Sequence, residues 1–326
     1  MGRYVEEISR LLVQGETRRR YCYGSSPGQY RALSRKLHAG QLVSPYRNVY
    51  ARKEYADSLD PIERSRHLVR TLALMHPWWR FAGISAASMF GFEHGYVLHK
   101  DGLVFIAGKE STPKSSDSHL RHIYAPHTSM KVIDGVKVTS VARTLVDCAL
   151  LYPFEQVLPL FDSALRRGLL VDKEVTGICS GLRCDYTRVL RPLRYADGLS
   201  ENGGESRCRA LLIDSGFAVP RLQREFIDPK TGARYRTDFS WECGNGRIVV
   251  LEYDGLEKYV NPEMNHGYGS WQVVNDERAR ESALIRAGVS VVVRLSSKQL
   301  HEQGVPVRRL VNAGVPMMRR MVSSRQ

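Results

Sequence analysis

The sequence lacks the features that mark three common classes of protein. Its six cysteines form no C-x-x-C pair and histidine is scarce near them, which argues against a zinc site. Isolated thiols in a chain of 326 residues suggest a reducing, cytoplasmic environment. The N-terminal segment MGRYVEEISR has no apolar signal core, and no run approaches the roughly 18 apolar residues of a membrane-spanning helix.

Negative charge is the other deficit. The chain has 48 Lys and Arg against 34 Asp and Glu, and this net charge of +14 favours a polyanionic partner, nucleic acid before a membrane surface. The excess is uneven, because residues 195–300 hold 14 basic and 15 acidic side chains. If the protein binds DNA, most of the electrostatic attraction therefore comes from the rest of the chain. The length allows two or three domains of about 100–150 residues.

Residues 1–55 have the pattern of a small helical domain with a hairpin. Apolar residues recur at helical spacing after Ser25 or Ser26, either of which could cap a helix, and Gly40 supplies a stop. The segment QLVSPYRNVYAR then alternates like a short hairpin with Asn48 at its tip. A basic helix followed by a small wing is typical of a winged helix-turn-helix.

The cations of this segment allow two interpretations. The expected helix carries Arg31, Arg35 and Lys36, and the expected wing carries Arg47. In a winged helix they would contact DNA phosphates and set the register of binding. They could equally be the solvated face of a helix that binds nothing.

The rest of the chain predicts two further domains and a tail. Residues 56–194 alternate helix and strand signals and then become helical, while YADGLSENGG is a polar, turn-rich boundary. Residues 200–300 read as a helix, three strands, a second helix and a strong strand. Residues 301–326 form a basic tail that we expect to close as a helix.

Carboxylates sit where the pattern predicts a buried strand. In RIVVLEYDG, alternation places Glu252 and Asp254 on one face with Val250. The preceding strand carries Asp238, and a hairpin loop centred on Asn245 would put Asp238 opposite Glu252. Carboxylates about 5 Å apart repel each other unless a cation lies between them or one is protonated.

A hard divalent cation with oxygen ligands, Mg²⁺ or Mn²⁺, would explain this cluster. Asp238, Glu252 and Asp254 are the predicted ligands. Glu205, at the start of the preceding helix, is either a further metal or water-orienting group or an acid favoured by the helix dipole. The competing interpretation is that the carboxylates pair with cations at the sheet end, namely Arg236, Arg247 or Lys258.

A helix with Glu205, a strand, a strand with Asp238 and a strand carrying LEYDG, followed by helix and strand, resembles the PD-(D/E)xK nuclease core. The likeness is to its very-short-patch-repair (Vsr) branch and covers about residues 200–300. It implies metal-assisted hydrolysis of a phosphodiester, with Asp238 and Glu252 as ligands. Asp254 departs from the pattern because many relatives have Lys there, and Lys258 is the substitute cation. The predicted catalytic set is thus Glu205, Asp238, Glu252, Asp254 and Lys258.

The N-terminal half resembles a second family. The order of a winged helix, GISAASMFGFE and VTSVARTLVDCAL, over about residues 5–170, is similar to AbiEi-type antitoxins of toxin–antitoxin systems. That resemblance implies promoter DNA binding through Arg31, Arg35, Lys36 and Arg47. On the helix of the last motif, four residues separate Arg143 from Asp147, and we expect a structural ion pair.

Together these patterns predict a cytoplasmic α+β and α/β multidomain protein. We expect a winged helix-turn-helix over 1–55, an AbiEi-like α/β and helical region over 56–194, a restriction-endonuclease-like mixed sheet flanked by helices over 200–300, and the basic tail. The expected activity is Mg²⁺-dependent cleavage of DNA in phage defence, a toxin–antitoxin system or DNA repair. The alternative is a non-catalytic regulator or antitoxin with a degenerate nuclease fold. Its partners would be DNA and a cognate toxin or another protein, not a membrane, while RNA as substrate and the oligomeric state stay open.

Overall fold

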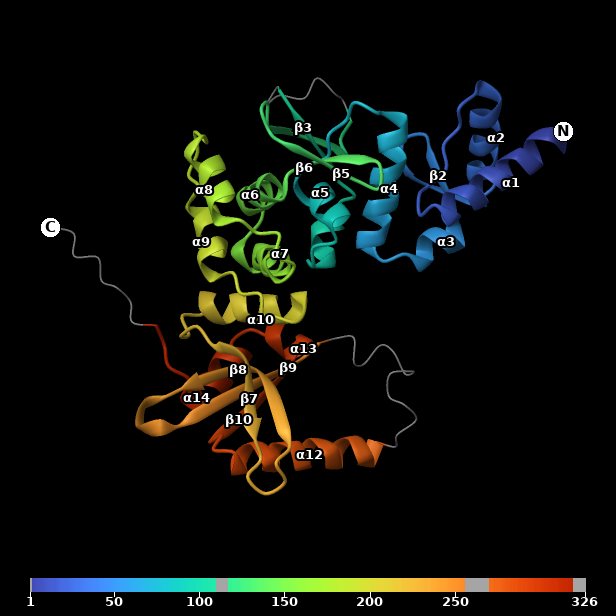
Figure 1. Ribbon diagram of the computed structural model, residues 1–326. Coiled ribbons are helices and arrows are strands. Elements are labelled where there is room, and N and C mark those ends of the chain that lie inside the picture. The colour runs from blue at the N-terminus through green and yellow to red at the C-terminus, as the bar shows by residue number, and fades with distance from the viewer. Residues whose placement is uncertain (1, 110–116, 256–269, 319–326) are drawn as a thin grey trace. The chain divides into compact units, whose positions relative to one another are not determined.

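The computed structural model describes residues 2–109, 117–255 and 270–318 of a mixed α/β protein. The chain divides into two compact units, one formed by residues 1–164 and 168–195 and the other by residues 165–167 and 196–326 (Figure 1). In the described part of the chain no helix is long and apolar enough to cross a membrane.

The first unit begins with two helices and a hairpin. The elements are α1 (Gly2–Thr17), α2 (Pro27–His38), β1 (Leu42–Tyr46), β2 (Val49–Arg52) and α3 (Lys53–Ser58). Ser26 caps α2 by accepting a hydrogen bond from the amide of Gln29. The two strands pair antiparallel around Asn48, whose φ of 61° is the left-handed conformation that a tight turn needs. The expected helix stop and hairpin are therefore confirmed.

The remainder of the first unit places small sheets against helices. The elements are α4 (Pro61–Met75), α5 (Gly83–Phe90), η1 (Tyr96–His99), β3 (Val104–Gly108), β4 (Leu120–Tyr124), β5 (Met130–Ile133), β6 (Val136–Thr139), α6 (Val141–Leu151), α7 (Phe154–Arg166), α8 (Asp172–Ser180) and α9 (Thr187–Tyr195). Phe81 is fully buried and bridges β3 and β6. Val49 and Ala51 of the hairpin share one core cluster with Leu72 of α4, so residues 1–55 and 56–194 are joined by packing.

The predicted ion pair on α6 is confirmed. Arg143 Nε lies 2.8 Å from Asp147 Oδ1, and the same guanidinium donates to the carbonyl of Tyr124. Asp147 is almost completely buried, and this burial raises its pKa to about 7 despite the adjacent guanidinium. Because the Arg143 guanidinium binds both Asp147 on α6 and the carbonyl at the end of β4, the ion pair has a structural role.

The second unit is a four-stranded mixed sheet with helices on both sides. The elements are α10 (Gly203–Asp214), β7 (Arg221–Ile227), β8 (Arg234–Glu242), η2 (Gly244–Gly246), β9 (Ile248–Asp254), α12 (Ser270–Arg286), β10 (Val291–Ser296), α13 (Ser297–His301) and α14 (Val305–Ala313). The strand order is β10-β9-β8-β7, with β10 parallel to β9 and the other pairs antiparallel. The tail thus contains a helix, as its pattern predicts.

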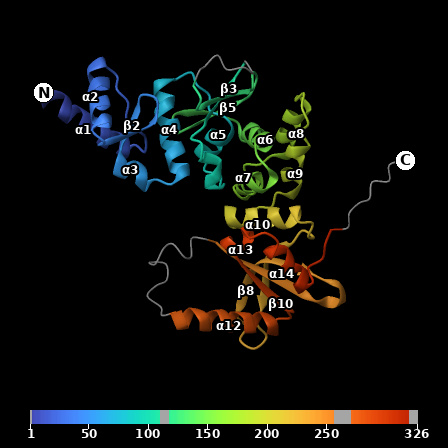
Figure 2. The same ribbon diagram turned by 180° about the vertical axis from the view of Figure 1, so that it is seen from behind.

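Strand β9 is covered on both faces, and its alternation is as expected. Val249 and Leu251 join a core with α10, α13 and α14, whereas Val250 joins Leu284 of α12 in a separate core. Figures 1 and 2 show α10 and α12 on opposite sides of this sheet. A polar side chain at the end of β9 must therefore find its partners at the sheet end or on these helices.

The β7–β8 turn is fixed by one buried carboxylate, which generates a stability prediction. Asp228 accepts two bonds from Arg286, at 3.0 and 2.6 Å, and the guanidinium holds its pKa far below the ordinary value. A carboxylate whose pKa is depressed on folding stabilises the folded state at pH values above its unfolded-state pKa of about 4. This stabilisation is lost as the pH falls from there toward the depressed pKa.

Asp228→Asn should lower the free energy of unfolding at pH 7, and the deficit should shrink as the pH falls below 4. Urea unfolding across pH, with the exposed-pair variant Glu225→Gln as control, measures it; a pH-independent deficit contradicts it.

Candidate carboxylate site

Glu205 closes the first turn of α10. Its amide donates to the N-cap side chain of Asn202 at 3.0 Å. Its carboxylate accepts from the amide of Glu201 at 2.8 Å, from Asn202 Nδ2 at 2.7 Å and from Gln223 Nε2 at 3.2 Å. Both oxygens are therefore engaged in holding the helix start to β7, which makes Glu205 a positioning residue in this structure.

A glycine brings α10 close to the end of β9. A Cβ placed on Gly204 would lie 2.9 Å from a ring carbon of Tyr253 and 3.0 Å from the Asn202 side chain. Real side chains do not tolerate such a contact with a ring that packs into the core. The Gly-Gly pair before Glu205 thus seats the helix start on the strand that carries Glu252.

Asp238 stands where β8 and β9 stop pairing. The ladder runs from Glu242↔Ile248 to Phe239↔Leu251, and one further step places Asp238 opposite Glu252, the register that a loop centred on Asn245 predicts. Instead of a backbone carbonyl, Asp238 Oδ2 accepts the amide of Tyr253 at 2.8 Å. The carboxylate is therefore inserted between two strands at the sheet end.

Glu252 is paired with a cation that the sequence pattern did not identify. Its Oε1 lies 2.9 Å from the guanidinium of Arg280 on α12, and its side chain is only 15% exposed. Arg280 also donates to the carbonyl of Arg236. Arg280 precedes the buried Ala283 and Leu284 by three and four residues, so helical periodicity assigns it to their face. That spacing is the signal that would have found it.

The three carboxylates influence one another electrostatically. Burial and, to a smaller degree, the negative charge of Asp238 raise the pKa of Glu205 to about 7, against the hydrogen bonds that lower it. Burial also raises the pKa of Glu252; Arg280 opposes this increase and Asp238 adds to it. Both raised values reflect negative charge held in a poorly solvated place, which is the condition a bound cation would relieve.

The other predicted residues are distributed differently. Asp254 pairs in register with Ser296 at the end of β10 and is half-buried. Lys258 lies outside the described residues. Beside the predicted residues, Arg294 on β10 pairs in register with Glu252, and its guanidinium lies 3.2 Å from the carboxylate of Glu277 on α12. Arg236 contacts Glu201 rather than the cluster, so the sheet-end pairing involves an arginine other than those the sequence suggested.

The carboxylate oxygens of this site are ligands of the kind that a hard divalent cation prefers, but they are few in number. Mg²⁺ is often held by one or two carboxylates, with water and substrate phosphate completing its shell, and Asp238 and Glu252 are such a pair. Within residues 2–109, 117–255 and 270–318, no group of three or more His, Cys, Asp or Glu is arranged to hold a metal. A cation at Glu252 would also have to compete with Arg280.

The predicted DNA contacts in the first unit are displayed on α2 and the hairpin. Arg31 and Arg35 are exposed one turn apart, and Arg47 is exposed at the hairpin tip. Lys36 is half-buried and donates to Gln41 at 3.0 Å. The buried side of α2 is formed by Ala32 and Leu33, so the two arginines face solvent.

Comparison with known proteins gives no functional assignment. Two uncharacterised proteins of Mycobacterium tuberculosis, from strains CDC 1551 / Oshkosh and H37Rv, are each 29% identical over 134 residues. The match covers 40% of this chain and 47% of each relative, so it spans about half of their length. No family model matches the chain. No solved structure matches it either.

The electrostatic coupling of the site can be measured directly. Asp238→Asn removes a negative charge that raises two neighbouring pKa values, so the pKa of Glu205 should fall below about 7 and that of Glu252 should fall as well. Carbon-detected NMR titration of the side-chain carboxyls reports both. Glu225→Gln, on the exposed end of β7, is the control and should move neither. If Asp238→Asn leaves both values unchanged, the three carboxylates do not form one site.

Proposed function

We propose that this chain is a DNA-binding protein whose second unit is a metal-dependent endodeoxyribonuclease. The observation that carries the proposal is the inserted carboxylate of Asp238 at one end of a mixed sheet, together with Glu205 and Glu252, whose pKa values are raised by burial first and by the charge of Asp238 second. A raised pKa alone also occurs at a structural carboxylate such as Asp147. Here two carboxylates with raised pKa values adjoin a third at one sheet end, and such a cluster is a candidate for taking up a proton or a cation.

The order of elements supports the same proposal. A helix bearing Glu205, two antiparallel strands, a third strand bearing Glu252, and a helix leading to a parallel strand are the arrangement that the resemblance to the Vsr branch of PD-(D/E)xK nucleases implies. In the first unit, a capped helix with exposed Arg31 and Arg35 and an adjacent hairpin tipped by Arg47 agrees with the proposed AbiEi-like winged helix.

The residues divide the proposed chemistry among themselves. Asp238 and Glu252 would hold the cation, and Glu205 fixes the start of α10 beside them. Bound there, Mg²⁺ supplies a water of lowered pKa and stabilises charge on the scissile phosphate. Arg280, once released from Glu252, keeps its bond to the carbonyl of Arg236 and presents a guanidinium for a phosphate oxygen.

A second candidate function is favoured by the Arg280–Glu252 ion pair. An arginine in contact with the half-buried carboxylate neutralises it without a metal. With Asp254 where many nuclease relatives have Lys, the second unit would then be a degenerate nuclease fold that binds without cutting. The protein would act as a transcriptional regulator or antitoxin through the first unit, with a cognate toxin as partner.

Metal binding and cleavage separate these functions. Mn²⁺ titrated calorimetrically into the wild type should bind saturably, and plasmid DNA should be nicked by the same sample. The Asp238→Ala, Glu252→Ala double variant should lose both, because it removes the two oxygen ligands. Arg280→Gln should bind Mn²⁺ several-fold more tightly, since the competing guanidinium is gone.

The matched control is Asp228→Ala, which removes a different carboxylate of the same unit, one that Arg286 holds at the β7–β8 turn. It should keep Mn²⁺ binding wherever it remains folded by circular dichroism. Absence of Mn²⁺ binding and nicking in both the wild type and Arg280→Gln, with DNA still retained at low salt, would reject the nuclease and leave the regulator.

DNA binding by the first unit predicts a salt-dependent loss. Replacing Arg31, Arg35 and Arg47 by Gln should weaken duplex binding and reduce the slope of log K against log salt by up to about 3, because each lost phosphate contact removes about one released counterion. Fluorescence anisotropy at several salt concentrations measures this slope. A triple change of the exposed Lys131, Lys173 and Lys230 to Gln alters the net charge equally. If both triples weaken binding alike, the attraction is not localised on α2 and the hairpin.

A further inference from the structure

A cavity of about 510 Å³ lies beside the hairpin tip of the first unit. Its wall is formed by three segments that are distant in sequence: the tip of the β1–β2 hairpin, the end of α4 with the turn after it, and the start of β4. The lining residues are Tyr46, Arg47, Asn48, Met75, His76, Trp79, Asp117, Ser118, His119 and Leu120. The volume falls in the range of small-molecule sites, roughly 300–1,000 Å³.

One side of the cavity is an aromatic platform. The rings of His76 and Trp79 stack with centroids 4.0 Å apart and an interplanar angle of 14°. Trp79 also makes an edge-to-face contact with the buried Phe81, with ring centroids 6.2 Å apart, and both His76 and Trp79 are half-buried. Burial lowers the pKa of His76, so the platform is uncharged near neutral pH. It is thus a rigid flat surface that remains partly open to solvent.

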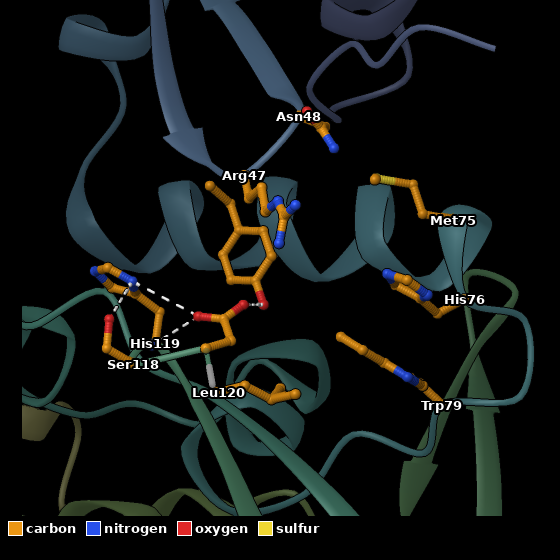
Figure 3. A pocket seen from close by; sticks show the side chains of 10 residues that line it. Arg47, Asn48, Met75, His76, Trp79, Ser118, His119 and Leu120 are labelled. Atoms are coloured by element: carbon orange, nitrogen blue, oxygen red, sulfur yellow. Dashed lines mark hydrogen bonds and ion pairs between the residues drawn. The ribbon is translucent and has the colours of Figure 1, made fainter. Parts of the chain in front are cut away.

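The opposite side presents polar groups that point inward. Figure 3 shows the Arg47 guanidinium and the Asn48 amide directed into the space across from His76 and Trp79. The residue before Arg47, Tyr46, donates its hydroxyl proton to Asp117, whose other oxygen accepts the amide of His119 at 2.9 Å. The carboxylate is already satisfied, which leaves the arginine as the cation that faces the cavity among the lining residues.

We propose that this cavity binds a nucleobase together with its phosphate. The base would stack on Trp79, which is backed by His76; the Asn48 amide would bond an edge of the base; and Arg47 would contact the phosphate. Aromatic stacking is tolerant of base identity because every base has a π-face, and a guanidinium is suited to phosphate oxygens. The nucleotide can be free or belong to a single strand, because the recognised groups are the same in both.

The neighbouring features favour this ligand over an apolar one. The cavity is open, polar on one side, and placed at the tip of a hairpin in a chain of net charge +14. A purely apolar ligand would make no use of the Arg47 guanidinium, which is exposed at the rim of the cavity. The site does not depend on the carboxylates of the second unit or on cleavage, and it adds a base contact to the phosphate contact proposed for Arg47.

Calorimetric titration tests the site with three probes: adenosine 5′-monophosphate, ribose 5-phosphate and an oligo(dA) single strand. Saturable binding of the monophosphate, with ribose 5-phosphate about tenfold weaker or more, is expected for a free nucleotide. Binding of the single strand without the monophosphate identifies a strand as the source. In either case Trp79→Ala and Arg47→Gln should each weaken binding about tenfold or more, while Trp79→Phe retains most of it.

The adjacent tryptophan provides the matched control. Trp78 is 71% exposed and is not part of the cavity lining, so Trp78→Ala should leave the affinity within about twofold. Because Trp79→Ala also removes a core contact, Arg47→Gln, at an exposed position, keeps the test valid if that variant fails to fold. Binding by no probe, equal binding of ribose 5-phosphate and the monophosphate, or affinities unchanged in both Arg47→Gln and a folded Trp79→Ala would overturn the proposal. Duplex binding that survives any of these outcomes leaves the proposed DNA-binding function intact.

Discussion

The second unit depends on one constraint, which is that β9 is buried on both faces up to the point where its carboxylates begin. Val249 and Leu251 pack toward α10, and Val250 packs toward α12, so the strand has no solvated side on which to place Glu252. The Glu252 carboxylate therefore lies at the strand end, between two helices and a neighbouring strand. Asp238 enters the same place from β8 by replacing a ladder hydrogen bond with one from its carboxylate. Every other feature of the site, including the glycine contact with Tyr253 and the capping of α10, follows from fitting these groups into that end.

This arrangement has an electrostatic cost that the rest of the unit does not remove. A pKa of about 7 for Glu205 corresponds to roughly 3 kcal/mol against its ionised form, by the relation of about 1.4 kcal/mol per pKa unit. The contrast with Asp228 in the same unit is informative. There a carboxylate that is less desolvated than Glu205 receives a bidentate arginine, an amide and a hydroxyl, and its pKa falls. The protein can stabilise the ionised form of a buried carboxylate where architecture requires it, yet the hydrogen bonds to Glu205 leave its pKa raised.

The sequence predicted what depends on local pattern and missed what depends on packing between elements. Alternation and loop length identified the two faces of β9 and the register that brings Asp238 toward Glu252, because strand geometry is nearly invariant. It also limited the cap of α2 to Ser25 or Ser26, of which Ser26 is the cap, and it identified the turn at Asn48. It did not identify Arg280, since several cations on α12 compete and only the packing of Ala283 and Leu284 decides which one faces the sheet. The cavity beside the hairpin was missed for a similar reason. Tyr46, Trp79 and Asp117 meet through tertiary folding, and no sequence pattern links them.

The two units differ in how they treat charge, and this difference bears on function. In the first unit Arg31, Arg35 and Arg47 project into solvent, where a polyanion would meet exposed cations. In the second unit the arginine nearest the carboxylates is already bound to Glu252, so any phosphate or metal must exchange with it. A site of this kind binds a ligand only under one condition. The ligand must interact with Glu252 and Arg280 at least as favourably as the two side chains interact with each other. Such a site is compatible with both of the proposed functions. The Arg280–Glu252 contact is thus the interaction on which the choice between the two proposed functions turns.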